Sequence, residues 1–180
     1  MELKIIKVEP DSPLNEKVDC LLNKVFPKTE RYSMDELKFW STFDTVEYKA
    51  FLDGNTFVGF YYIFQTEKMI WGLYLAVEPS LQSKGYGSAV IKQYMQPFAD
   101  KEIVFGIEVP DENADNAEQR IRRLKLYERH GLTHTGYSYF IDSDKYWLMS
   151  SKGKDFDKAE FLKLYGFLTG GKDSIELIKE

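Results

Sequence analysis

Apolar residues in the first half of the chain fall into short runs separated by turn residues. Residues 47–52 and 56–65 are rich in β-branched and aromatic side chains, and they flank the turn tripeptide Asp53-Gly54-Asn55. This pattern predicts a β-hairpin. Residues 69–77 form a third run of the same kind, and residues 3–8 form an opening one. We therefore expect a first strand and, further along the chain, an antiparallel meander.

Two segments between the opening strand and the meander have helical features. Residues 15–25 repeat apolar side chains at helical spacing, and Phe26-Pro27 ends the pattern because proline cannot continue a helix. Ser33 and Glu36 have the spacing of a capping box, in which each side chain satisfies a free backbone N–H of the first turn. A short second helix is expected to follow.

The second half of the chain alternates between the two periodicities. Residues 86–98 and 117–130 have helical spacing, whereas residues 102–109 read as a strand. Strand, helix, strand and helix in this order predict a parallel βαβ crossover. Residues 137–141 and 145–149, on either side of a polar turn, predict a closing hairpin. The fold class expected from these elements is α+β, with a mixed central sheet.

The last part of the chain is expected to belong to the same domain. A chain of 180 residues favours one domain, which we place at residues 1–150, with 151–180 as its C-terminal helical extension. A helix in residues 155–180 should end at Gly170-Gly171 and leave a short tail. This segment either mediates homodimerisation or covers a sheet edge.

Composition excludes several kinds of chemistry. The net charge of −5 argues against a general nucleic-acid binder. Cys20 is the only cysteine, and His130 and His134 are the only histidines. The sequence therefore has too few cysteines for a disulfide framework and few of the Cys and His ligands that a metal site would need. Neither a signal peptide nor an apolar run long enough for a membrane span is found. We expect a cytoplasmic protein that acts without a metal or a membrane.

The segment after the third strand of the meander carries the strongest motif. Gln82-Ser83-Lys84-Gly85-Tyr86-Gly87 fits a phosphate-binding pattern, Gln/Arg-x-x-Gly-x-Gly/Ala, at each fixed position. Its glycines permit positive φ, and the helix that follows presents free N–H groups and the positive end of its dipole to an anion. The dinucleotide fingerprint would need a third glycine, and the Walker loop would need a lysine after its glycine span. The alternative is an ordinary helix start after a glycine turn.

With this motif the chain resembles the GNAT superfamily of N-acetyltransferases. The strands before and after the motif match in order and spacing, as does Leu126-Tyr127-Glu128-Arg129-His130-Gly131-Leu132 on the next helix. One departure is Arg120, which stands where the family often carries Asn. The resemblance implies a GNAT-like fold in which two parallel strands splay apart, and transfer of an acetyl group from acetyl-CoA to an amine. The cofactor-binding residues that it implies are, for the pantetheine arm, Leu75, Ala76 and Val77, and for the pyrophosphate, Gln82, Ser83, Lys84, Gly85, Tyr86, Gly87 and Ser88.

Two side chains are candidates for proton transfer. Tyr127 matches the family's tyrosine, which is placed to donate a proton to the CoA sulfur; on periodicity alone it would be a core aromatic residue. Glu108 interrupts an apolar strand near its C-terminal end, where loss of hydration suits a carboxylate to accept a proton. The alternative for Glu108 is a solvent-facing carboxylate or an ion pair with Arg122 or Arg123.

The acceptor is expected to be a primary amine of a small molecule or a peptide, and its identity cannot be derived from the sequence. Residues 15–43 and the acidic loop 110–118 are the expected specificity regions, the latter because its charge attracts a cationic amine. Two other functions remain open: a catalytically inactive acyl-CoA-binding or regulatory module on the same fold, and a protein that binds a nucleotide phosphate.

Overall fold

Helices and strands of the computed structural model follow the predicted order with small shifts in their ends. The structure describes residues 2–82, 84–168, 170 and 175–180. The strands are β1 (Lys4–Lys7), β2 (Val46–Asp53), β3 (Thr56–Gln65), β4 (Met69–Val77), β5 (Glu102–Glu108), β6 (Thr133–Ile141), β7 (Asp144–Ser150) and β8 (Ile178–Lys179). The α-helices are α1 (Pro13–Val25), α2 (Met34–Trp40), α3 (Tyr86–Met95), α4 (Ala117–Arg129) and α5 (Lys158–Leu168). Short 3-10 turns are η1 (Lys28–Glu30), η2 (Pro79–Leu81), η3 (Gln96–Phe98) and η4 (Gly153–Asp155).

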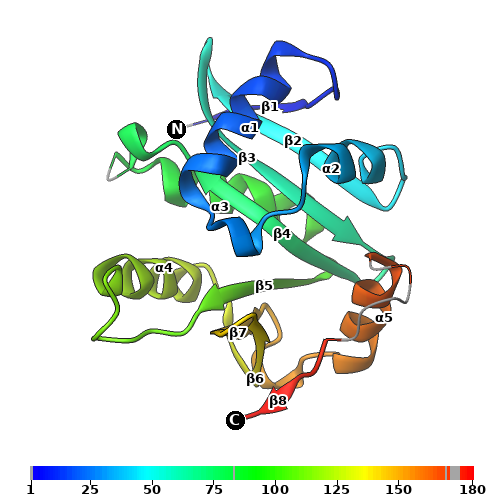
Figure 1. The fold of residues 1–180 in the computed structure, drawn as a ribbon, viewed down its shortest axis with the longest axis vertical. Coiled ribbons are helices and arrows are strands. Elements are labelled where there is room, and N and C mark those ends of the chain that lie inside the picture. Colours follow the sequence, from blue (N-terminus) through cyan, green and yellow to red (C-terminus); the bar gives the residue numbers. More distant parts are fainter. Residues whose placement is uncertain (1, 83, 169, 171–174) are drawn as a thin grey trace. The chain divides into compact units, whose positions relative to one another are not determined.

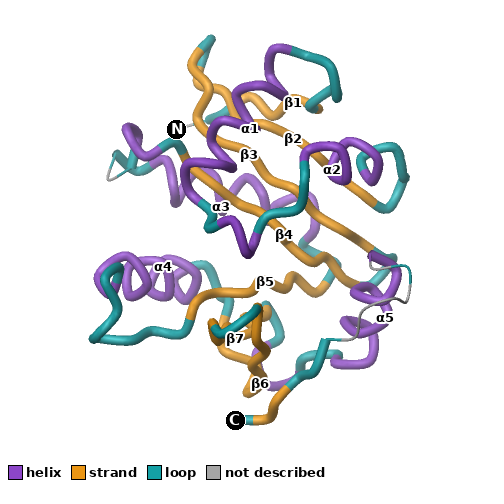
Figure 2. The backbone as a smooth tube through the Cα atoms, in the orientation of Figure 1, coloured by secondary structure: helices purple, strands orange, loops and turns teal. Residues whose placement is uncertain are grey.

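The chain forms two compact units. Unit 1 contains Met1–Gln65 and Gly72–Pro97, and unit 2 contains Thr66–Trp71 and Phe98–Glu180. The strand order is β1-β2-β3-β4 in unit 1 and β4-β5-β7-β6-β8 in unit 2, with β4 contributing residues to both. β4 and β5 form the parallel pair. The antiparallel pairs include β1–β2 and β2–β3 in unit 1, and β5–β7, β6–β7 and β6–β8 in unit 2. The α+β class with a mixed sheet is confirmed (Figures 1 and 2).

Unit 1 has helices on both faces of its strands. The Tyr62 hydroxyl donates to the carbonyl of Leu37 in α2, over 2.8 Å. Tyr61, the preceding residue of β3, packs edge-on against Tyr94 of α3, with ring centroids 5.1 Å apart. Because successive side chains of a strand point to opposite faces, α2 covers one face and α3 the other. α1 lies on the same face as α2, since its Asn15 accepts a hydrogen bond from Tyr48 of β2, which itself packs against Tyr62.

The two predicted helix starts in unit 1 have clear local causes. Ser12 caps α1 by accepting from the Asn15 N–H, and proline occupies the first helical turn. At α2 the predicted capping box is confirmed: the Ser33 side chain accepts from the Glu36 N–H, and Glu36 accepts from the Ser33 N–H. These caps fix where α1 and α2 begin, and the cap at Ser33 also marks the end of the loop between the two helices.

The closing hairpin of unit 2 differs from the prediction in its first strand. β6 begins at Thr133 instead of Tyr137, and its register with β7 shifts between His134 and Ser138. Gly136 has a φ of 83° inside this irregular stretch. A left-handed residue breaks the two-residue alternation, which explains why the pattern concealed the start of the strand.

The C-terminal segment contains a strand that the sequence did not predict. α5 begins at Lys158, later than expected, and Gly171 of the predicted Gly-Gly stop lies outside the described residues. Ile178 pairs with Ser138, and Lys179 with Tyr137, so that β8 lies along the edge of β6. Covering a sheet edge, one of the two roles expected for this tail, is therefore what its described end does within unit 2.

Candidate functional site

The predicted phosphate loop follows β4 in unit 1 and opens directly into α3. Gly85 is the N-cap residue of α3, with a left-handed φ of 87° and no side chain to bond the first turn. A Cβ atom at this position would meet nothing within 4 Å, so the glycine is required by its conformation and not by crowding. The start of this ten-residue helix consequently lacks a side-chain cap, which is the arrangement that suits binding of an anion.

The residues beside Gly85 lie at the surface. Gln82 and Lys84 are exposed, and Ser88 is exposed in the first turn of α3. Ser83 was also predicted to bind the cofactor, and it lies outside the described residues. The lysine supplies positive charge next to the helix start, in a unit of a protein that is acidic as a whole.

Contacts near both ends of α3 hold the helix in place. The Tyr86 hydroxyl donates to Asp53 in the β2–β3 turn over 2.7 Å, and this hydrogen bond raises the pKa of Tyr86. Gln93 exchanges two hydrogen bonds of 2.9 Å with the backbone of Leu3. Because its hydroxyl is engaged, Tyr86 can contribute to a phosphate site only through its backbone and ring.

The predicted pantetheine residues form the last part of β4. Leu75 and Val77 are half-buried, whereas Ala76 between them is buried. Gly59 of β3 lies against this stretch so closely that a Cβ atom on it would be 2.0 Å from the Ala76 carbonyl oxygen. The Glu78 N–H continues the contact by donating to the Val58 carbonyl over 2.8 Å. The sequence offered no signal for Gly59, because nothing in its own strand requires a glycine.

Tyr127 is in unit 2, on the inner face of α4. Its side chain is 6% exposed and stacks on Phe105 of β5, with ring centroids 5.1 Å apart. Burial raises the pKa of Tyr127, and the charge of nearby Arg123 lowers it by a smaller amount. The phenol is therefore protonated at neutral pH and able to donate.

Glu108, at the end of β5, is surrounded by hydrogen-bond donors. One carboxylate oxygen accepts from Arg123 over 2.8 Å, and the other lies 3.0 Å from the Asn116 amide and 3.1 Å from Arg120. The ion pair with Arg123 was one of the two alternatives for this residue; Arg122 instead lies near Glu118. Two guanidinium groups and one amide therefore occupy both oxygens of the Glu108 carboxylate.

Arg120, the departure from the family pattern, belongs to the same network. Its Nε donates to the Asn116 side chain over 2.7 Å, and another nitrogen donates to the Val109 carbonyl over 3.0 Å. Arg120 thus joins the start of α4 to the end of β5 within unit 2. Its guanidinium is bonded to Asn116, Val109 and Glu108 of the chain itself. Arg120 therefore does not offer a free side-chain donor in the way that an unbonded Asn amide would.

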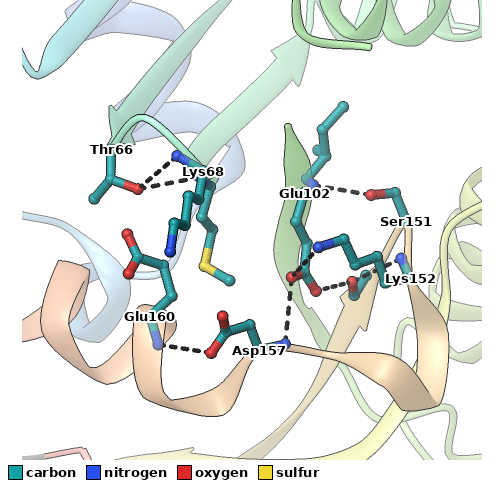
Figure 3. Close-up of polar contacts among 10 residues, drawn as sticks. Thr66, Lys68, Glu102, Ser151, Lys152, Asp157 and Glu160 are labelled. Atoms are coloured by element: carbon teal, nitrogen blue, oxygen red, sulfur yellow. Dashed lines mark hydrogen bonds and ion pairs between the residues drawn. The ribbon is translucent and has the colours of Figure 1, made fainter. Parts of the chain in front are cut away.

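A buried carboxylate that the sequence did not single out is Glu102, the first residue of β5. It is 1% exposed and accepts from the Ser150 hydroxyl over 2.5 Å and from the Asp157 N–H over 3.3 Å. Figure 3 shows Lys152 reaching the same carboxylate, and the ammonium nitrogen is 3.6 Å from its oxygen. Since these contacts tie β5 to the end of β7 and to the segment leading into α5, the network accounts for the burial of Glu102 by structure alone.

Two further findings concern the kind of site. In the part of the chain that the structure describes, no group of three or more His, Cys, Asp or Glu side chains is arranged to hold a metal ion. Over the same residues, no helix combines the length and apolar character needed to cross a membrane.

Comparison with known proteins gives a family and a fold. The model of the acetyltransferase (GNAT) family matches residues 15–132, more than half of the chain. No curated protein matches the sequence significantly. A structure from Bacteroides thetaiotaomicron, described as an acetyltransferase of the GNAT family, has a TM-score of 0.70 at 19% identity and covers 93% of this chain and 94% of its own.

Two other solved structures are similar over most of their length. An aminoglycoside 6'-N-acetyltransferase complexed with coenzyme A has a TM-score of 0.61 at 17% identity, over 82% of this chain and 95% of its own. A spermidine N-acetyltransferase chimera from Vibrio cholerae and hSSAT has a TM-score of 0.65 at 16% identity, over 87% of this chain and 100% of its own. At such identities the similarity establishes a shared fold.

Proposed function

Because the chain belongs to the acetyltransferase (GNAT) family, we propose that it moves an acetyl group from acetyl-CoA to a primary amine by direct attack of the amine on the thioester. Family membership makes the protein an acetyltransferase with acetyl-CoA as its co-substrate. The observation that carries the proposal is Gly85, whose left-handed backbone opens an uncapped α3 immediately after β4.

The loop and the end of β4 are the proposed binding elements. Residues 82–88 hold the pyrophosphate through backbone N–H groups at the start of α3, with Lys84 adding charge. Leu75 to Val77 pair with the pantetheine arm as one strand pairs with another. When bound, acetyl-CoA supplies the activated acetyl group as a thioester.

Proton transfer is the proposed task of two side chains in unit 2. Tyr127 donates a proton to the departing sulfur, for which its protonated, buried phenol is suited. Glu108 accepts the proton of the amine, directly or through water, while Arg120 and Arg123 hold its carboxylate in position. If the Arg contacts instead define its whole role, Glu108 only positions the end of β5, and another group is the base.

The amine acceptor is supported by the chemistry of similar proteins. The two structures named above are acetyltransferases of an aminoglycoside and of spermidine, both compounds with primary amines. We infer the same acceptor chemistry for this chain, with the individual small molecule or peptide still to be identified. A cytoplasmic location agrees with the supply of acetyl-CoA and is part of the proposal.

Two experiments test this function. Isothermal titration with CoA, dephospho-CoA and ATP should give the tightest binding for CoA; binding of ATP alone would favour a nucleotide-binding protein. A thiol-release assay with acetyl-CoA and pools of primary amines should then detect transfer. CoA binding without transfer to any pool would favour the inactive acyl-CoA-binding module.

A further inference from the structure

Arg31, in the loop between α1 and α2, is a positively charged residue to which the proposed function assigns no role. The residue is half-buried, and its Nε atom is fully enclosed without a hydrogen-bond partner. Across the described residues, none forms an ion pair or a hydrogen bond with its side chain. A guanidinium remains charged at any physiological pH, so this is a partly enclosed positive charge that has no counter-ion among the described residues. Buried polar atoms in native structures are nearly always hydrogen-bonded, so this nitrogen calls for an explanation, and a bound ligand is one.

The backbone of Arg31 is held rigidly by one residue of β4. The Tyr74 hydroxyl donates to the Glu30 carbonyl over 2.8 Å and accepts from the Tyr32 N–H over 3.0 Å. These two groups belong to the peptide bonds on either side of Arg31, whose own backbone is extended. Burial raises the pKa of Tyr74, which keeps its hydroxyl protonated and able to make both bonds.

This contact sets Arg31 beside the part of β4 that carries the proposed chemistry. Tyr74 is adjacent to Leu75, the first of the residues that we propose to pair with pantetheine. Aromatic rings surround the contact: Phe26 packs against Tyr74, and Trp40 packs against Tyr32, each with ring centroids 4.9 Å apart. Apolar rings limit the access of water, which strengthens any ion pair that Arg31 makes there.

We propose that Arg31 binds a carboxylate of the acceptor, so that the substrate is an amine that also carries a carboxylate, such as an amino acid. The guanidinium presents a planar fork of N–H donors that matches the two oxygens of a carboxylate. This assignment rests on the proposed acetyl transfer and adds the acceptor class to it.

The test compares pairs of acceptors that differ only in the carboxylate. Tyrosine against tyramine, phenylalanine against phenethylamine and lysine against cadaverine would be assayed for thiol release from acetyl-CoA. The proteins would be the full chain, Arg31→Gln, Arg31→Lys and Lys28→Gln, the last a control that removes an exposed charge from the same loop. Thermal unfolding of each protein would be recorded in parallel.

For the unchanged chain we expect at least a tenfold larger kcat/KM with the carboxylated member of the best pair. Arg31→Gln should remove that preference by raising KM, Arg31→Lys should retain part of it, and Lys28→Gln should leave it intact. The unfolding temperature of Arg31→Gln should not fall, because the arginine makes no bond that the variant would lose.

Any of four outcomes would overturn the assignment. The first two are equal use of both members of each pair and a loss in Arg31→Gln that is the same for both members. The others are a lowered unfolding temperature of Arg31→Gln, which would indicate a structural role, and transfer to neither member of any pair. Calorimetry of CoA binding then shows whether the proposed function fails as well, since the proposal gives Arg31 no contact with CoA.

Discussion

Gly85 opens α3 with a φ of 87°, a conformation that a β-branched residue adopts only under strain. Because of this strain, we expect Gly85→Val to weaken CoA binding roughly tenfold or more. A tenfold weaker affinity corresponds to a loss of about 1.4 kcal/mol of binding free energy. The measurement is calorimetric titration with CoA. The matched control is Gly166→Ala in α5, where φ is not positive and a Cβ meets nothing within 4 Å. Unchanged affinity in Gly85→Val would remove the loop from the CoA site.

Tyr127 combines a buried position with a hydroxyl that the stacking contact to Phe105 does not require. Tyr127→Phe keeps the ring and removes the proton donor. We expect the turnover number to fall roughly a hundredfold, the lower range of a general acid's contribution, with little change in CoA affinity. Steady-state kinetics with a responsive amine would measure this. A turnover number equal to that of the unchanged chain would leave Tyr127 as a core residue only.

Glu108 allows its two roles to be separated by substitution. Glu108→Gln keeps the shape but removes the charge that pairs with Arg120 and Arg123. If the carboxylate accepts the amine proton, turnover should fall roughly a hundredfold and recover at high pH, where the free amine is abundant. A pH–rate profile with the shape of the unchanged protein, together with a lower free energy of unfolding, would instead show a positioning role.

At the level of elements, the junction of β5 with the segment before α5 depends on Glu102. Glu102→Ala leaves the Ser150 hydroxyl and the Asp157 N–H without their acceptor. We expect the free energy of unfolding to fall by about 2–3 kcal/mol. Denaturant unfolding would measure it, with Glu112→Ala in the exposed β5–α4 loop as the control. Equal midpoints for the two variants would mean that the buried carboxylate contributes no net stability.

Local patterns predicted the elements well, and long-range contacts explain what they missed. β4 was predicted with its observed ends, because turn residues bound an unbroken apolar run, and the capping box at Ser33 depends on residues three apart. By contrast, the bonds between Tyr74 and the loop around Arg31 join residues more than forty positions apart. β8 is two residues long, and nothing in Ile178–Lys179 itself indicates a strand.

In the candidate site, too, the features that depend on contiguous residues were predicted, and those that depend on long-range contacts were not. The loop at Gly85 was identified because its glycines and the following helix are contiguous in sequence. The donors around Glu108 depend on how α4 packs on β5: the sequence raised Arg123 as an alternative partner, but it did not indicate Asn116 or Arg120. Gly59 is explained only by the backbone of a neighbouring strand. The functional roles of these residues remain predictions.

For the whole molecule, buried tyrosines set the alkaline limit of stability. Burial raises the pKa of Tyr48, Tyr61, Tyr62 and Tyr74 above the ordinary value of about 10. The unfolded chain therefore loses these protons at a lower pH than the folded chain does. The free energy of unfolding should be unaffected by them below pH of about 10 and should fall above it, by about 1.4 kcal/mol per pH unit for each tyrosine.

Denaturant unfolding at several alkaline pH values would measure that slope. Tyr62→Phe should make it shallower by the contribution of one proton, whereas Phe64→Leu, which alters packing but no ionisable group, should not change it. An identical slope in Tyr62→Phe would mean that Tyr62 ionises without unfolding.

The central claim is acetyl transfer from CoA to an amine, and isotope-labelled acetyl-CoA tests it most directly. The protein would be incubated with acetyl-labelled CoA and a pool of primary amines, and the products analysed by mass spectrometry. We predict a labelled N-acetyl product that forms with the unchanged protein and forms far more slowly with Gly85→Val. Tight CoA binding with no labelled product from any amine pool would contradict the account and identify the chain as a binding module.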